Sequence, residues 1–170
     1  MRDLVVSWSI SRFIGGMTAL LVLEALDRAE IALTDSVQIS PRAAAMKGSQ
    51  ALLDASAVYP LEDLLRTTIM ASANDSAVAL SEYIAGSEEN FVDRMNRRAA
   101  ELGMANTNYV NCTGYPQSGQ YTTARDVCRL CCEIRSARSS SSSALAYRGL
   151  PCGSSDFHSD SRERPRPPGR

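Results

Sequence analysis

Apolar residues recur about one helical turn apart from Met17 onward, a pattern typical of a helix with one buried face. The residues of this stripe are Leu20, Leu21, Leu23, Ala25 and Leu26. The sequence before Met17 shows no clean period. Between 33 and 40 the pattern alternates weakly, with Val37 and Ile39 on one side, and this predicts a short strand.

A break at Tyr59-Pro60 precedes the second predicted helix, which we expect to begin at Leu61. Glu62 and Asp63 lie in its first turn, where negative charge suits the positive end of the helix dipole. The predicted buried stripe of this helix is Leu61, Leu64, Leu65 and Ile69. The spacing therefore predicts two amphipathic helices separated by a short extended segment.

Short polar residues and glycines mark the ends of two further helices. The third helix is expected to begin at Asn74 or Asp75, one of which would serve as N-cap, and to stop at Gly86. Ser87 is expected to cap the fourth helix, which Gly103 ends. The predicted inner face of this fourth helix is Phe91, Met95, Ala99 and Leu102.

The C-terminal part of the chain changes character near Ile134. Residues 123–126 resemble a capping box with Asp in place of Glu, which predicts a last helix ending at about Ile134. Residues 135–170 are rich in Ser, Arg and Pro and poor in large apolar residues. Because such a composition buries little apolar surface, we expect this segment to be disordered.

Charge and lysine content restrict the chemistry. The 170 residues suffice for one domain, and a net charge of −1 gives no indication of a nucleic-acid partner. Residues 1–134 carry 11 basic and 16 acidic side chains, whereas 135–170 carry 7 arginines and 3 acids. Of the 18 basic residues, 17 are Arg and only Lys47 is Lys. Any reaction that needs a lysine base therefore depends on Lys47 alone.

The cysteines do not suggest a disulfide framework or a metal site. There are five, at 112, 128, 131, 132 and 152. Cys128-x-x-Cys131 resembles half of a zinc site, but no second pair follows, and the single histidine is His158 in the tail. We therefore expect no bound metal or other cofactor and interpret these cysteines as small apolar residues of a helix.

An N-terminal apolar stretch raises the question of a membrane segment. Residues 4–23 are rich in apolar residues, but Arg12 lies near the centre, followed by the Gly15-Gly16 pair. A central charge costs about 2.5–3.5 kcal/mol on membrane-insertion scales, and no signal-peptide cleavage site follows. We expect no signal peptide, although a membrane anchor within residues 4–26 stays open as an alternative.

Six segments, which follow one another along the chain, together carry a resemblance to a known protein family. They are MTALLVLEAL (17–26), MKGSQALL (46–53), DLLRTTIMASANDSAVALSEYIAG (63–86), SEENFVDRMNRRAAELGM (87–104), NTNYVNCTGY (106–115) and TTARDVCRL (122–130). Together they resemble the low-molecular-weight D-alanyl-D-alanine carboxypeptidases, which are serine peptidases of the penicillin-binding class. The resemblance covers residues 17–134, about 70% of the chain.

Members of this family carry three motifs, S-x-x-K, S-x-N and K-T-G. Only the second is present, as Ser72-Ala73-Asn74. The resemblance implies that Ser72 relays protons near the leaving amine and that Asn74 holds the amide of the substrate. Read alone, the same three residues are also typical of a helix-capping turn.

The first and third motifs are missing. The family pattern places the nucleophilic serine at Arg12 and the lysine base at Gly15. Ser9 and Ser11 are followed three residues later by Arg12 and Ile14, and an arginine remains protonated in proteins. Lys47 precedes Gly48-Ser49 in a segment that resembles a non-catalytic part of the family. We therefore expect a catalytically incompetent chain, truncated or frameshifted at both ends.

The resemblance also implies a fold, a location and partners. We expect a mainly α chain, namely the helical part of the α+β serine β-lactamase/DD-peptidase-like fold, with most of the antiparallel sheet missing. Three regions are predicted: a non-matching segment (1–16), a partial carboxypeptidase-like domain (17–134) and the tail (135–170). The implied partners are peptidoglycan stem peptides ending in D-Ala-D-Ala and β-lactams, at the cell envelope.

Two alternative functions of other classes remain besides that of an inactive carboxypeptidase. The chain is alternatively a non-catalytic module that binds peptidoglycan peptides, or a small membrane-anchored helical protein.

Without the sheet, we expect several core side chains to be left partly exposed and the helical body to be marginally stable. The side chains in question are Leu20, Leu23, Leu64, Leu65, Phe91 and Met95.

Overall fold

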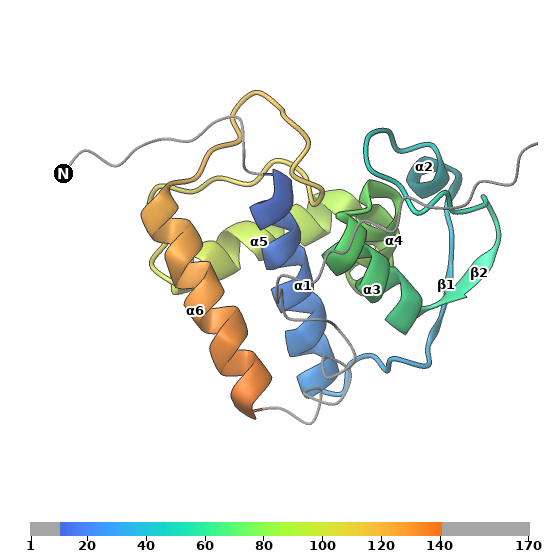
Figure 1. The fold of residues 1–170 in the computed structure, drawn as a ribbon, viewed down its shortest axis with the longest axis horizontal. Helices are drawn as coiled ribbons and strands as arrows, with labels where there is room; N and C mark the ends of the chain where they lie inside the picture. The colour runs from blue at the N-terminus through green and yellow to red at the C-terminus, as the bar shows by residue number, and fades with distance from the viewer. Residues whose placement is uncertain (1–10, 141–170) are drawn as a thin grey trace, which may run out of the picture.

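The computed structural model describes the backbone of residues 11–140 and the side chains of residues 15–136. Helices dominate this part of the chain (Figure 1). Its elements are α1 (Ser11–Asp27), β1 (Ser36–Gln38), α2 (Pro41–Ala44), β2 (Val58–Pro60), α3 (Leu61–Ala71), α4 (Asn74–Ala85), α5 (Glu88–Glu101) and α6 (Ala124–Ser140). The expected mainly helical fold is confirmed.

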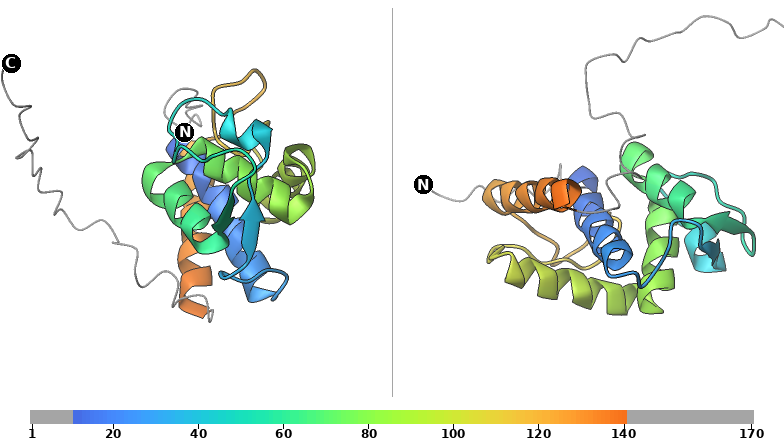
Figure 2. Two further views of the ribbon diagram at one scale, coloured as in Figure 1. Left: turned by 90° about the vertical axis from the view of Figure 1, so that its right-hand side faces the viewer. Right: turned by 90° about the horizontal axis from the view of Figure 1, so that it is seen from below.

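Helix α1 lies at the centre of the molecule. It packs against α3, α4, α5 and α6, and the views from the front and from below both place it between α6 and α3 (Figures 1 and 2). Its side chains from Met17 to Leu23 are all buried, which explains why its sequence is apolar on nearly every side. The helix begins at Ser11, six residues before the predicted start at Met17.

Burial by neighbouring helices corrects the expectation of an exposed core. Leu20, Leu23, Leu64, Leu65, Phe91 and Met95 are each at most 3% exposed. Because α1 is surrounded by four other helices, these side chains meet helical neighbours and do not need a large sheet to cover them. Three other residues predicted to be inside, Leu26, Ile69 and Leu102, are only partly buried.

The sheet within the described residues has two short antiparallel strands, with Val37 opposite Tyr59. Val37 is buried and its two neighbours in β1 are exposed, as the weak alternation predicted. The pair lies at the edge of the molecule opposite α6, beside α4 (Figure 1). Most of the antiparallel sheet of the related fold is thus absent from this part of the chain.

The ends of α4 and α5 follow the predicted signals with one exception. Ser87 caps α5 by accepting a hydrogen bond from the Asn90 amide, and Gly86 ends α4 with φ 77°. The N-cap of α4 is Ala73, however, so the expectation of Asn74 or Asp75 in that role is wrong. Both side chains instead form hydrogen bonds with the loop of residues 47–53.

The start of α6 also departs in detail from the expected capping box. Thr123 Oγ1 accepts a hydrogen bond from the Asp126 amide, but the Asp126 carboxylate accepts from Asn106 and Thr107 and does not reach back to Thr123. The helix continues to Ser140, beyond the predicted end at about Ile134. Residues 135–140 are therefore helical, whereas the rest of the predicted disordered tail lies outside the described residues.

Candidate functional site

Ser72 occupies the turn between α3 and α4 and has a strained backbone. Its φ and ψ are 53° and 40°, the left-handed region that costs a non-glycine residue about 1–2 kcal/mol. The side chain is half-buried, and its hydroxyl has no hydrogen-bond partner among the described residues. Because strained backbone conformations cluster at functional sites, Ser72 is a candidate site residue.

Asn74 holds the loop of residues 47–53 against this turn. Its Nδ2 donates to the carbonyl of Lys47 at 2.6 Å, and its backbone N–H donates to the carbonyl of Ser49 at 2.8 Å. A Cβ atom on Gly48 would lie 2.7 Å from Nδ2, and Gly48 has φ 94°. Only glycine fits between these two carbonyls, since a side chain there would collide with the Asn74 amide.

Asp75 is buried and fixes the same loop from the other side. Its carboxylate accepts hydrogen bonds from the backbone N–H groups of Ala51 at 3.0 Å, Leu53 at 3.2 Å and Ser76 at 2.8 Å. Leu52 lies between the first two donors and is 78% exposed. Sequence reasoning missed this role, because two of the three donors lie 22 and 24 residues away and no local pattern marks them.

A cavity of about 330 Å³ opens beside Asn74. It is lined by Gly48, Ser49, Ala71, Ser72, Asn74, Tyr115 and Pro116. Its far wall is held by Asn111, which accepts a hydrogen bond from the Gly114 amide at 2.7 Å and donates to the Tyr115 carbonyl at 2.8 Å. We call this hollow the Asn74 cavity.

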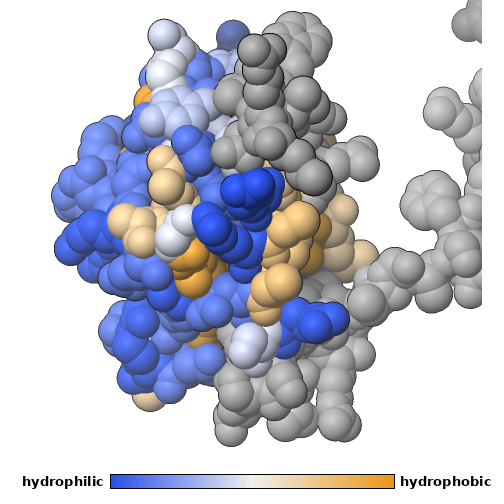
Figure 3. Space-filling view, turned by 90° about the vertical axis from the view of Figure 1, so that its left-hand side faces the viewer, coloured by the Kyte–Doolittle hydropathy of each residue, from blue (hydrophilic) through white to orange (hydrophobic). Residues whose placement is uncertain are grey.

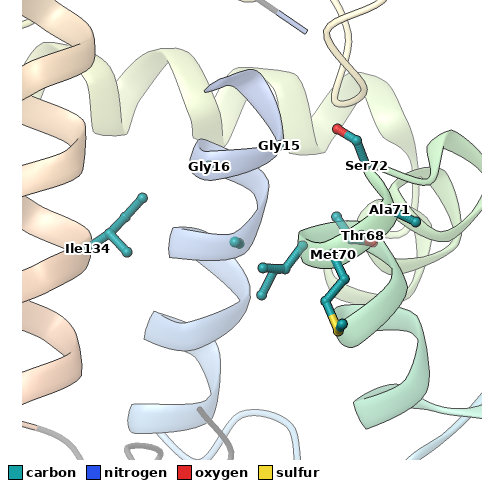
Figure 4. A pocket seen from close by; sticks show the side chains of 9 residues that line it. Gly15, Gly16, Thr68, Met70, Ala71, Ser72 and Ile134 are labelled. Atoms are coloured by element: carbon teal, nitrogen blue, oxygen red, sulfur yellow. The ribbon is translucent and has the colours of Figure 1, made fainter. Parts of the chain in front are cut away.

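A second cavity, of about 360 Å³, opens on the other side of Ser72. It is lined by Gly15, Gly16, Ala19, Thr68, Ile69, Met70, Ala71, Ser72 and Ile134. Figure 4 shows Gly15 and Gly16 on α1 across the cavity from Ser72. We call it the Gly15 cavity, and Ser72 lines both hollows.

The geometry brings together residues far apart in the sequence. A Cβ atom on Gly15 would lie 4.0 Å from Ser72 Oγ. The position at which the sequence resemblance predicts the family lysine therefore faces Ser72. In this chain that position carries no side chain, and the Arg12 side chain lies outside the described residues.

Neither cavity contains an acid–base pair among the residues that the structure describes. The linings include no Lys, His, Asp or Glu. Lys47 contributes its carbonyl to Asn74, while the residue itself is exposed and is absent from both linings. Among the described residues that line the two cavities, the Ser72 hydroxyl therefore has no group that would take its proton.

Beneath the site, α1 and α5 are joined through the segment around Cys112. Thr18 Oγ1 donates to the Cys112 carbonyl at 2.8 Å, and the Cys112 amide donates to Glu88 at 3.1 Å. Burial, together with the charge of Glu88, raises the pKa of the Cys112 thiol well above its usual range. This cysteine is thus an inert part of the core.

Metal ligands are not gathered anywhere in residues 15–136, where no group of three or more His, Cys, Asp or Glu is suited to hold an ion. The histidine and the fifth cysteine of the sequence, His158 and Cys152, lie outside the described residues. In the same part of the chain, no helix is long and apolar enough to cross a membrane.

Comparison with known proteins agrees with this geometry. The peptidase S11 family model, described as D-alanyl-D-alanine carboxypeptidase, matches residues 9–147. The D-alanyl-D-alanine carboxypeptidase DacF of Bacillus subtilis is 42% identical over 118 residues, which cover 69% of this chain and 30% of the relative. DacC of Escherichia coli is 37% identical over 121 residues, which cover 67% of this chain and 30% of the relative.

Solved structures show the same arrangement. The crystal structure of the D-alanyl-D-alanine carboxypeptidase DacD from Francisella tularensis matches with a TM-score of 0.77 and 31% identity, over 85% of this chain and 33% of that one. Penicillin-binding protein 5 from Haemophilus influenzae matches with a TM-score of 0.75 and 32% identity, over 79% of this chain and 39% of that one. The chain belongs to the D-alanyl-D-alanine carboxypeptidase family of penicillin-binding serine peptidases.

The match covers only part of each relative. The chain spans about 30% of the length of the curated relatives that it matches. The family model begins eight residues before and ends 13 residues after the 17–134 region to which the sequence resemblance was assigned. Helix α1, including the Arg12 and Gly15 positions, therefore lies within the matched range.

Proposed function

We propose that this chain binds D-Ala-D-Ala peptides, and β-lactams that resemble them, through Ser72 and Asn74 without cleaving them. The observation that carries the proposal is the pair of unlike cavities at Ser72. The Asn74 cavity retains the ordered amide of Asn74 beside Ser72. The Gly15 cavity has Gly15 at the position where the resemblance places the lysine base of the family.

The Asn74 cavity has the groups needed to hold a peptide. Asn74 Nδ2 is fixed by the Lys47 carbonyl, which leaves Oδ1 without a donor among the described residues. A peptide N–H supplies such a donor, and the free Ser72 hydroxyl can donate to the neighbouring peptide carbonyl. Tyr115, which is 52% exposed, offers an aromatic wall for the apolar parts of the ligand.

Hydrolysis requires groups that this site does not present. A serine hydroxyl is a weak nucleophile at neutral pH and needs an adjacent base. The family positions for nucleophile and base are Arg12 and Gly15, and an arginine neither attacks a carbonyl nor accepts a proton. We therefore infer that the family reaction, trimming of peptidoglycan stem peptides through an acyl-enzyme, does not proceed on this chain.

The proposed ligand places the protein at the cell envelope, where stem peptides occur. Binding without cleavage favours the peptide-binding module over the alternative of a small membrane-anchored protein. The apolar stretch of residues 4–23 lies partly outside the described residues, and its residues 17–23 are buried in α1, which packs against four helices. Side chains already buried in the protein core are not free to contact lipid.

Peptide titration tests this proposal. A fluorescent peptide ending in D-Ala-D-Ala should bind saturably to the full chain, while chromatography of the mixture should detect no released D-Ala. Asn74→Ala should abolish binding. Asn90→Ala is the matched control, because Asn90 also donates its amide to a backbone carbonyl but lies on α5, away from both cavities. Equal affinity of the wild-type protein for a peptide ending in L-Ala-L-Ala, or release of D-Ala, would contradict the proposal.

A further inference from the structure

Helix α6 carries three thiols that the S-x-N site does not use. Cys128, Cys131 and Cys132 are free and exposed. Their spacing of i, i+3 and i+4 places them on one face, about one turn apart. Figure 1 shows α6 at the outer edge of the molecule, and Figure 3 views that side, where apolar patches lie among strongly hydrophilic ones.

The opposite face of the helix is occupied. Leu130 is 2% exposed, and a Cβ on Gly16 of α1 would lie 3.5 Å from both Leu130 and Ile134. Since this face packs on α1, the thiol face points away from the core. The three cysteines are therefore accessible to reagents while α6 remains docked.

A disulfide within this face is not expected from its geometry. Residues three or four apart on a helix have Cβ atoms about 5–6 Å apart. A disulfide requires Cβ atoms about 3.5–4.5 Å apart. Direct oxidation within one chain would thus distort α6. The described residues also hold no group of three ligands suited to a metal ion. Two thiols separated by this gap instead suit a single thiophilic atom that bonds to both.

We propose that Cys128 and Cys131 form a two-thiol capture site for trivalent organoarsenicals, compounds with one carbon substituent on As(III). Each S–H loses its proton to a hydroxyl group on arsenic, and that oxygen leaves as water. Two As–S bonds form, two As–O bonds break and two water molecules are released. Arsenic stays trivalent and sulfur keeps its oxidation state, so the step needs no oxidant or reductant.

The helix rise identifies which two of the three thiols form the closest pair across a turn. At about 1.5 Å per residue, Cys131 lies about 4.5 Å from Cys128 along the axis of α6, whereas Cys132 lies about 6 Å from it. Partial burial raises the pKa of Cys131, and the neighbouring thiols Cys128 and Cys132 raise it further. A bridge between Cys128 and Cys131 links successive turns of α6 and should raise the melting temperature of the protein, because α6 packs against the central helix α1.

The test uses phenylarsine oxide and intact-mass spectrometry on the full chain with Cys152→Ser as background. One adduct per chain should form, survive excess 2-mercaptoethanol and be removed by the dithiol dimercaptopropanol. Cys128→Ser and Cys131→Ser should each lose the monothiol-resistant adduct. Cys132→Ser, an equally exposed position on the same helix, should retain it. Circular dichroism establishes that each variant is folded.

Three outcomes overturn the inference. The first is the absence of an adduct that resists the monothiol. The second is an adduct that persists in Cys128→Ser or Cys131→Ser. The third is loss of the adduct in Cys132→Ser, which would move the bridge to a different pair of thiols. None of these outcomes depends on peptide binding at Ser72.

Discussion

The two cavities that meet at Ser72 differ in how firmly their polar groups are held. On the Asn74 side, the start of α4 and the loop of residues 47–53 are joined by four hydrogen bonds from or to Asn74 and Asp75. On the Gly15 side, most of the lining residues have apolar side chains or none, and the Thr68 hydroxyl donates to the Leu64 carbonyl of its own helix. The Asn74 side is therefore pre-organised. On the Gly15 side, position 15 is a glycine and has no side chain that could act on Ser72.

We propose that this difference separates binding from catalysis within one site. Positioning a ligand needs groups fixed before the ligand arrives, and the Asn74 side has them. Activating a serine needs a base within hydrogen-bond reach, and the described residues that line the Gly15 side include none. We therefore expect this serine to take part in recognition without reacting.

Removing the carboxylate that fixes the loop should have the largest effect. Asp75→Ala leaves three backbone N–H groups in or near the core without their acceptor, and we expect the free energy of unfolding to fall by about 3 kcal/mol or more. Urea denaturation measures the change. Asp93→Ala, at an exposed position on α5, should change it by less than about 0.5 kcal/mol. Equal losses in both variants would mean that Asp75 does not hold the loop.

A methyl group at Gly48 should disturb the Asn74 side specifically. Gly48→Ala introduces a Cβ 2.7 Å from Asn74 Nδ2 at a positive φ. We expect a loss of stability of about 1–2 kcal/mol and a weakening of peptide binding by about tenfold or more, equivalent to about 1.4 kcal/mol. Gly103→Ala shares the positive φ but has no atom within 4 Å of the added Cβ. That control should lose stability but keep its affinity, and equal affinity in both variants would argue against a role for the Asn74 amide.

The smallest effect is expected on the Gly15 side. Gly15→Ala adds a Cβ 4.0 Å from Ser72 Oγ, an ordinary contact, inside helix α1. Because alanine is favoured over glycine within a helix, the protein should gain about 0.5–1 kcal/mol of stability. Peptide affinity should not change. A decrease in affinity, measured by the same titration, would show that the Gly15 cavity takes part in ligand binding.

Local signals predicted much of the fold. The acidic first turn after Tyr59-Pro60, the Ser87 cap and the Thr123 cap each marked a helix start correctly, because capping depends on residues within one turn. The start of α1 was missed because Gly15 and Gly16 interrupt a helical pattern. The two glycines nevertheless lie within α1, where a Cβ on Gly16 would make ordinary contacts with Leu130 and Ile134 of α6.

The sequence proposes two residues of the candidate site but does not indicate their surroundings. Ser72 and Asn74 are proposed from one tripeptide and its flanking resemblance. The loop donors to Asp75, the close fit of Gly48 and the sharing of Ser72 between two cavities depend on contacts across 22 to 57 residues of sequence. No periodicity encodes such contacts, because the intervening helices determine which loops meet.

Penicillin labelling is the most direct measurement of whether Ser72 lies in a site that binds but does not react. The full chain should be incubated with labelled penicillin, and its mass should then be determined under denaturing conditions. We expect the unmodified mass, together with displacement by penicillin of a bound D-Ala-D-Ala peptide in a parallel native titration. A stoichiometric penicilloyl adduct on any serine would contradict the claim that this site does not react.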